Sequence, residues 1–102
     1  MIEIDLNDPK TLVGRTILVG ITYLNKDGSV ARQTQYFGTI RAIENMNITI
    51  EGDNGSPQPN IPYDVRALSK AARGQYLLRA TGEVIEDPDI LSTWTVTPQL
   101  DG

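Results

Sequence analysis

The feature that most constrains the fold of this chain is a long apolar alternation on either side of a tight turn. In residues 16–24, β-branched and aromatic side chains recur at every second position, which is the period of a β-strand. The intervening positions include Leu18 and Gly20, which indicates burial on both faces of that strand. Asn25-Lys26-Asp27-Gly28 follows, and Asp-Gly suits the positive φ angles of a hairpin turn. We therefore expect an antiparallel hairpin with a second strand over residues 30–43.

Gly38 interrupts this second strand. A glycine inside a long strand usually marks a bulge or a sharp bend, and a sharp bend is what a small barrel needs in order to close. Asn45 is expected to turn the chain again, and the alternation over residues 46–50 predicts a third strand. The first half of the chain is therefore expected to form a bent three-stranded meander.

Two short helices are expected. Asn7-Asp8-Pro9-Lys10 places a capping side chain before a proline, which suits the start of a short helix or 3₁₀ turn. A second helix is expected over residues 63–73, because Asp64 can cap its start and Gly74 can end it.

The remaining segments predict turns and short strands. Residues 52–60 are rich in Pro, Gly and Asn, which indicates an exposed loop. Further strands are expected over residues 75–80 and 93–97, with a weaker one over residues 83–85. The chain has 102 residues and no internal repeat, so we expect residues 1–102 to form a single, mostly β domain, a small barrel or roll.

The sequence contains neither cysteine nor histidine. Disulfides, thiolate nucleophiles, imidazole bases and the usual zinc, copper or iron sites are therefore excluded. Carboxylate chemistry and oxygen-ligated magnesium or calcium stay open, through Glu51, Asp53 and Asn54 or through Asp87 and Asp89, although neither run has the spacing of a calcium loop. We expect no bound metal, no cofactor and no enzymatic activity.

The net charge of −4 is unevenly distributed. Residues 60–80 carry four basic side chains against one acidic side chain, a net charge of +3, whereas residues 81–102 carry five acidic side chains and no basic one, a net charge of −5. The overall acidity argues against a broad nucleic-acid footprint, and the basic segment leaves room for a small anion-facing patch. Three alternatives are open for this patch: it binds a phosphate or an acidic partner, it is a solvated charged face, or it pairs with Glu83, Glu86, Asp87 and Asp89 within one chain or across a subunit boundary.

The first half of the chain resembles the first motif of Sm and Sm-like proteins. The residues that carry the resemblance are Leu12 to Val19 after a short helix, the Lys26-Asp27-Gly28 hairpin, Phe37-Gly38-Thr39-Ile40, and Ile43-Glu44-Asn45-Met46-Asn47. Arg73-Gly74 followed by Tyr76-Leu77-Leu78 is similar to the second motif. The resemblance covers residues 8–50 and 72–80. It implies a five-stranded barrel that assembles through strand edges and binds single-stranded RNA. We expect a small Sm-like or SH3-like β-barrel with a short N-terminal helix and, from the pattern of residues 63–73 rather than from the resemblance, one short helix before the later strands.

The residues that stand out as an RNA- or anion-binding set are Asn47, Arg66, Lys70 and Arg73. The resemblance gives Asn47 the role of bonding a base, and Arg73 would complete the pocket. Arg66, Lys70 and Arg73 also share one face of the expected helix. The structural alternatives are a turn residue at Asn47, a helix-end cation at Arg73 and a solvated charged face.

We therefore expect a non-enzymatic binding or assembly module that self-associates through strand edges or binds a protein partner. A single-stranded RNA-binding protein and a carboxylate-based enzyme are the alternatives. Trp94 is expected to be a core residue or an interface anchor. No apolar stretch is long enough to span a membrane and no secretion signal is visible at the N-terminus, so no membrane partner and a cytoplasmic location are expected.

Overall fold

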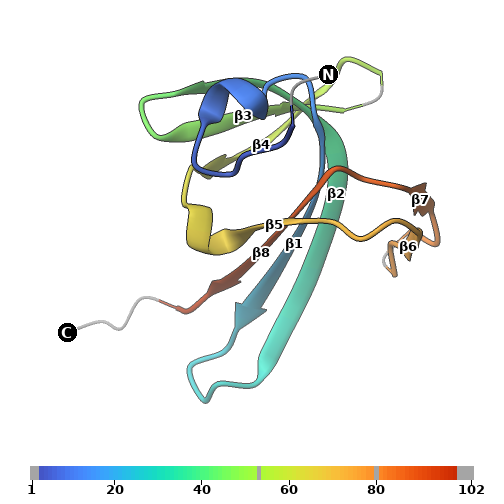
Figure 1. Ribbon diagram of the computed structural model, residues 1–102. Helices are drawn as coiled ribbons and strands as arrows, with labels where there is room; N and C mark the ends of the chain where they lie inside the picture. Colours follow the sequence, from blue (N-terminus) through green and yellow to red (C-terminus); the bar gives the residue numbers. More distant parts are fainter. Residues whose placement is uncertain (1–2, 53, 80, 99–102) are drawn as a thin grey trace.

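A computed structural model describes residues 3–52, 54–79 and 81–98 of the chain. Strands dominate it, with two single turns of 3₁₀ helix (Figure 1). The elements in chain order are η1 (Pro9–Thr11), β1 (Thr16–Leu24), β2 (Val30–Glu44), β3 (Asn47–Glu51), β4 (Pro57–Pro62), η2 (Val65–Ala67), β5 (Leu68–Lys70), β6 (Gln75–Leu77), β7 (Val84–Glu86) and β8 (Ile90–Val96). The mostly β class is confirmed.

Six of the strands form one mixed sheet in the order β4-β3-β2-β1-β8-β5. Neighbours are antiparallel except β1 and β8, which run parallel from the pair Ile17/Ile90 to the pair Tyr23/Val96. β4 and β5 stand at the two ends of the order and do not pair with each other. The expected closed barrel is therefore wrong, because the sheet bends without joining its end strands.

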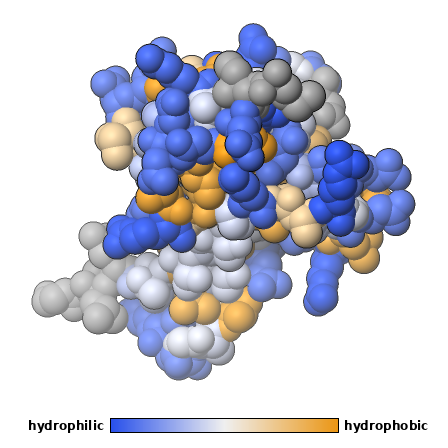
Figure 2. All heavy atoms as spheres, in the orientation of Figure 1, coloured by the Kyte–Doolittle hydropathy of each residue, from blue (hydrophilic) through white to orange (hydrophobic). Residues whose placement is uncertain are grey.

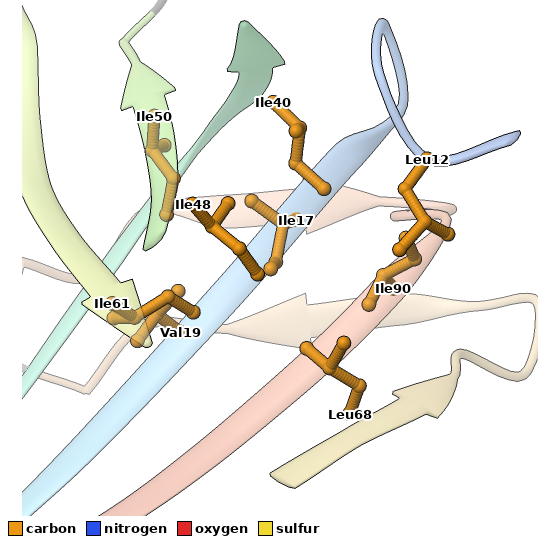
Figure 3. Packing of buried hydrophobic residues seen from close by; sticks show 9 residues of the cluster. All are labelled: Leu12, Ile17, Val19, Ile40, Ile48, Ile50, Ile61, Leu68 and Ile90. Atoms are coloured by element: carbon orange, nitrogen blue, oxygen red, sulfur yellow. The ribbon is translucent and has the colours of Figure 1, made fainter. Parts of the chain in front are cut away.

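The main core lies on one face of this bent sheet. Its side chains come from all six strands of the sheet and from the segment after η1, and Figure 3 shows them lying close together. The cluster consists of Leu12, Ile17, Val19, Ile40, Ile48, Ile50, Ile61, Leu68 and Ile90. The alternation that predicted β1 and β3 reflects this face, since Ile17 and Val19 are buried on β1 and Ile48 and Ile50 on β3.

Gly38 brings β2 and β3 together. A Cβ atom at this position would lie 2.5 Å from the Glu51 carbonyl oxygen and 2.7 Å from Cγ2 of Ile50, so only glycine allows so close an approach. The irregularity in the β2–β3 ladder falls between Ile40 and Ala42 instead.

A small hairpin of β6 and β7 covers part of the opposite face of the sheet. Leu78 and Ile85 from this hairpin pack on Leu18 of β1, together with Phe37 of β2 and Leu91 of β8. In Figure 1 the hairpin stands to one side, while the far ends of β1, β2 and β8 project beyond it.

The tight turns confirm the local sequence rules. Gly28 has a φ of 88° in the β1–β2 turn, and Asn45 and Met46 have φ of 51° and 62° in the β2–β3 turn. Asp8 caps η1 by accepting a hydrogen bond from the Lys10 amide. These positions need left-handed or capping residues, and the sequence supplies them.

Two expectations for the middle of the chain are wrong. The expected loop over residues 52–60 contains most of an edge strand, β4, whose residues Ile61 and Gln58 pair with Ile48 and Ile50 of β3. The expected helix over residues 63–73 is a single 3₁₀ turn followed by β5. Asp64 does cap this turn, but Leu68 then pairs with Ser92 of β8 and is buried, because tertiary pairing overrides a weak helix propensity.

The later strands are shorter or shifted relative to the expectations. β6 ends at Leu77, β7 covers Val84–Glu86, and β8 begins at Ile90. In the described ranges, no helix has the length and apolar content needed to cross a membrane.

Candidate binding surfaces

The four residues predicted to bind RNA or an anion lie on separate elements. Asn47 opens β3, Arg66 lies in η2, Lys70 ends β5 and Arg73 lies in the bend before β6. In the sheet order, β2, β1 and β8 stand between β3 and β5. The shared helical face expected for Arg66, Lys70 and Arg73 does not form, because the segment is not a helix. Binding of RNA by these residues stays a prediction.

Arg66 is engaged by its own cap. Its Nε and Nη2 atoms donate to the two carboxylate oxygens of Asp64 at 3.1 and 2.9 Å. These side-chain bonds, with the bond from the Arg66 amide, lower the pKa of the Asp64 carboxyl. The pair is exposed and stabilises the local turn only slightly.

The carboxylates considered for a metal have structural partners instead. Glu51 forms a 2.9 Å ion pair with Arg41, and Asp87 accepts a hydrogen bond from the Gly74 amide at 2.8 Å. Asp89 accepts from the Thr16 amide and hydroxyl at 2.9 and 3.1 Å. Asp53 lies outside the described residues. Across the described part of the chain, no group of three or more acidic side chains is placed to hold an ion.

The two end strands of the sheet carry residues that discourage pairing. β4 contains Pro57, Pro59 and Pro62, which lack the amide proton that a neighbouring strand would bond. β5 has three residues and ends in exposed Lys70. Short length, charge and proline are the usual means by which proteins block an open edge.

The last part of β8 has no such protection. β5 pairs with β8 over Ile90–Ser92 only. Over Thr93–Val96, β8 pairs with β1 on one side, and no strand of the described residues pairs with its other side. This segment, Thr-Trp-Thr-Val, contains neither charge nor proline and is rich in residues that favour strands.

Trp94 gives this edge a fixed shape. Its indole N–H donates to the buried Ser92 hydroxyl at 2.8 Å, and its ring packs partly against the main core. Val96 is 44% exposed on the same face of the strand. Trp94 is therefore half core and half surface, between the two roles that the sequence left open.

A groove of about 550 Å³ with a mixed polar and apolar lining lies on the opposite face of β1, β2 and β8. Gly20 of β1 forms the middle of its floor, with Gln35 of β2 on one side and Thr93 of β8 on the other. The next row places Gln33 beside Thr22, with a 3.3 Å hydrogen bond between the Gln33 amide and the Thr22 hydroxyl. Figure 2 shows a pale area of intermediate hydropathy in the lower half of the view, where these three strands project.

Arg79 stands at the rim of this groove. Its amide donates to Oε1 of Gln35 at 2.9 Å, so the chain after β6 is tied directly to the groove floor. The sequence placed Arg79 in the basic segment but gave no reason to single it out, because the groove combines strands that are far apart in the chain.

Tyr36 shows how β4 is held over β2. Its hydroxyl donates to the Pro59 carbonyl at 3.0 Å. Burial raises the pKa of Tyr36 to about 12, with a smaller contribution from Tyr23. This bond secures the proline-rich edge strand.

Comparisons with known proteins do not identify a family for this chain. No family model, no curated protein and no solved structure matches the chain.

Proposed function

We propose that this protein is a non-enzymatic assembly module that pairs with a second copy of itself through the open edge of β8. The observation that carries the proposal is the unprotected segment Thr93–Val96 in a sheet whose end strands are both protected. The absence of histidine and cysteine from the sequence supports a non-enzymatic role.

Every second residue of this segment directs its backbone groups outward. The Ala71 amide donates to the Asp89 carbonyl at 3.1 Å, and alternate residues of an antiparallel ladder bond to the same side. Thr93 and Thr95 therefore direct their N–H and C=O groups away from β1, where a further strand would bond them.

A two-fold pairing of this edge suits its side chains. With the axis at Thr95, antiparallel strands place Trp94 of one copy opposite Val96 of the other, and both residues lie on the same face. An aromatic residue opposite a β-branched one is a favourable cross-strand pair, and the symmetry repeats it. An isologous contact of this kind closes as a dimer rather than growing into a filament.

Proline substitution tests the proposal with little risk to the fold. Thr95→Pro removes an N–H that points away from β1, which is where an edge strand tolerates proline. In light scattering over a concentration series, the wild-type chain is expected to approach twice the 11.2 kDa mass of one chain. Thr95→Pro is expected to remain at the single-chain mass throughout.

A charge substitution gives an independent check with a matched control. Thr95→Lys places a charge beside the open edge, whereas Thr49→Lys places one on an exposed position of β3, which is paired on both sides. Only Thr95→Lys is expected to weaken the dimer. A wild-type chain that stays monomeric at the highest concentration reached, or a dimer that both Thr95 variants leave intact, contradicts the proposal.

A further inference from the structure

Gly20 is a glycine that the fold does not require. It lies in the middle of β1, a central strand, where glycine is unfavourable because it loses more backbone entropy and provides no packing. A Cβ atom at this position would meet nothing within 4 Å, and the φ of Gly20 is not positive. Neither crowding nor backbone conformation therefore explains it. Close approach by a bound molecule is the other common reason for a strand glycine.

The surroundings of Gly20 have the chemistry of a binding site. Hydroxyl and amide groups of Thr93, Gln35, Thr22 and Gln33 line the floor, and no carboxylate lines the groove. The volume of about 550 Å³ lies within the range of small-molecule sites. Because the whole chain has a net charge of −4, a groove with one cation and no acid is a local exception.

Arg79 supplies the cation, and its backbone is held in place. Leu78, next to it, is buried against Leu18 and Ile85, and its carbonyl accepts hydrogen bonds from the amides of Thr81 and Gly82 at 3.2 and 2.7 Å. The Arg79 amide is bound to Gln35. Among the described residues, no carboxylate forms an ion pair with the Arg79 guanidinium.

Gln35 is oriented to assist this cation. Since its Oε1 atom accepts the Arg79 amide, its Nε2 group is left to donate to a ligand from the same side of the groove. A guanidinium and a side-chain amide are both hydrogen-bond donors that suit the oxygens of a carboxylate or a phosphate. Gly20 leaves the space between Gln35 and Thr93 in which such a group would rest.

We propose that this groove binds the oxyanion group, carboxylate or phosphate, of a small polar molecule, with Arg79 as the charged contact and Gly20 as the space-making residue. This site is separate from the edge pairing proposed above. The groove uses side chains on one face of β1, β2 and β8, whereas the edge pairing uses the backbone of β8.

Titration of the ¹⁵N-labelled full chain with inorganic phosphate, succinate and neutral succinamide tests the inference. Phosphate, succinate or both are expected to cause saturable amide shifts at Gly20, Gln35 and Thr93, and succinamide is not. A response to one anion alone identifies which oxyanion the groove prefers. The absence of saturable shifts with either anion, or equal shifts with succinamide, overturns the proposal.

Three variants assign the response to the groove. Arg79→Gln is expected to weaken binding about ten-fold or more, because it removes a charge-assisted hydrogen bond. Lys10→Gln removes one positive charge from an exposed position outside the groove lining and is expected to bind as the wild type does. Gly20→Val fills the floor and is expected to abolish the shifts while the spectrum remains that of a folded chain. Equal binding by Arg79→Gln and wild type, or undiminished binding by Gly20→Val, refutes the assignment.

Discussion

Replacing Gly38 with alanine places a methyl group between two strands that are already in contact. The added Cβ would lie 2.5 Å from the Glu51 carbonyl oxygen and 2.7 Å from Ile50 Cγ2. The nearest of these atoms belongs to the backbone of β3, so β2 and β3 must move apart to admit it. Gly20→Ala is the matched control. Gly20 lies in β1, the strand next to β2, and a Cβ atom there would meet nothing within 4 Å.

The two substitutions are expected to change stability in opposite directions. Overpacking at Gly38 should lower the free energy of unfolding by about 1–3 kcal/mol. Alanine at Gly20 should raise it by roughly 0.5–1 kcal/mol, because alanine loses less backbone entropy on folding. For a domain of this size, 1 kcal/mol corresponds to a change of roughly 4–8 °C in Tm.

Thermal unfolding followed by circular dichroism, with urea unfolding of the same samples, measures both effects. A Gly38→Ala chain as stable as the wild type would show that β2 and β3 do not approach as closely as described. A Gly20→Ala chain destabilised as much as Gly38→Ala would show that Gly20 serves the fold, which removes the main support for the groove as a ligand site.

Two further predictions concern the strand ends and the edge strand. Asp89→Ala is expected to lower the free energy of unfolding in urea by about 1–3 kcal/mol, since it removes the carboxylate that accepts two of the three hydrogen bonds between Thr16 and Asp89 at the starts of β1 and β8; unchanged stability would rule out this link. Because the pKa of Tyr36 is raised from 10.0 to about 12, its contribution to stability is full below about pH 10 and is lost as the pH rises towards 12. Tyr36→Phe should therefore show a shallower loss of stability across that range, and an identical alkaline slope in both chains would contradict it.

The parts of the fold that follow from neighbouring residues were predictable. The β1–β2 hairpin was predicted with nearly the right bounds, because alternation and an Asp-Gly turn act within a few residues. The turn at Asn45 and the caps at Asp8 and Asp64 are local in the same way. Each depends on a backbone angle or a hydrogen bond that the sequence specifies directly.

The parts that depend on distant partners were not predictable. The prolines of β4 break the usual strand pattern, so its sequence predicts a loop. They are tolerated because no strand of the described residues pairs with the outer side of β4. Leu68 belongs to a strand because β8 lies beside it, although its own neighbours favour a helix. The parallel pairing of β8 with β1 has no local signal. The end strands β4 and β5 do not pair with each other, so the sheet is open where a barrel was expected.

The candidate sites were hidden for the same reason. Asn47, Arg66, Lys70 and Arg73 were chosen from spacing and resemblance, and the structure distributes them over separate elements. The groove needs Gly20, Gln35 and Thr93 in one row, which exists only after three strands have paired. The one sequence signal for the groove was a glycine inside the apolar alternation of β1. Gly38 also lies inside a strand, and the two differ in the structure because a Cβ atom at Gly20 would meet nothing within 4 Å whereas one at Gly38 would clash with β3.

The open edge and the groove have one structural origin. β5 covers the edge of β8 as far as Ser92, and the β6–β7 hairpin covers the opposite face around Leu18 and Leu91. Beyond both covers, β8 continues beside β1 to Val96. Because pairing at the edge would use outward backbone groups whereas the groove uses side chains, the two activities should separate. Thr95→Pro is expected to abolish dimerisation and leave the anion-dependent shifts unchanged, whereas Arg79→Gln is expected to do the reverse, and a variant series in which both are always lost together would mean that only one of the two sites exists.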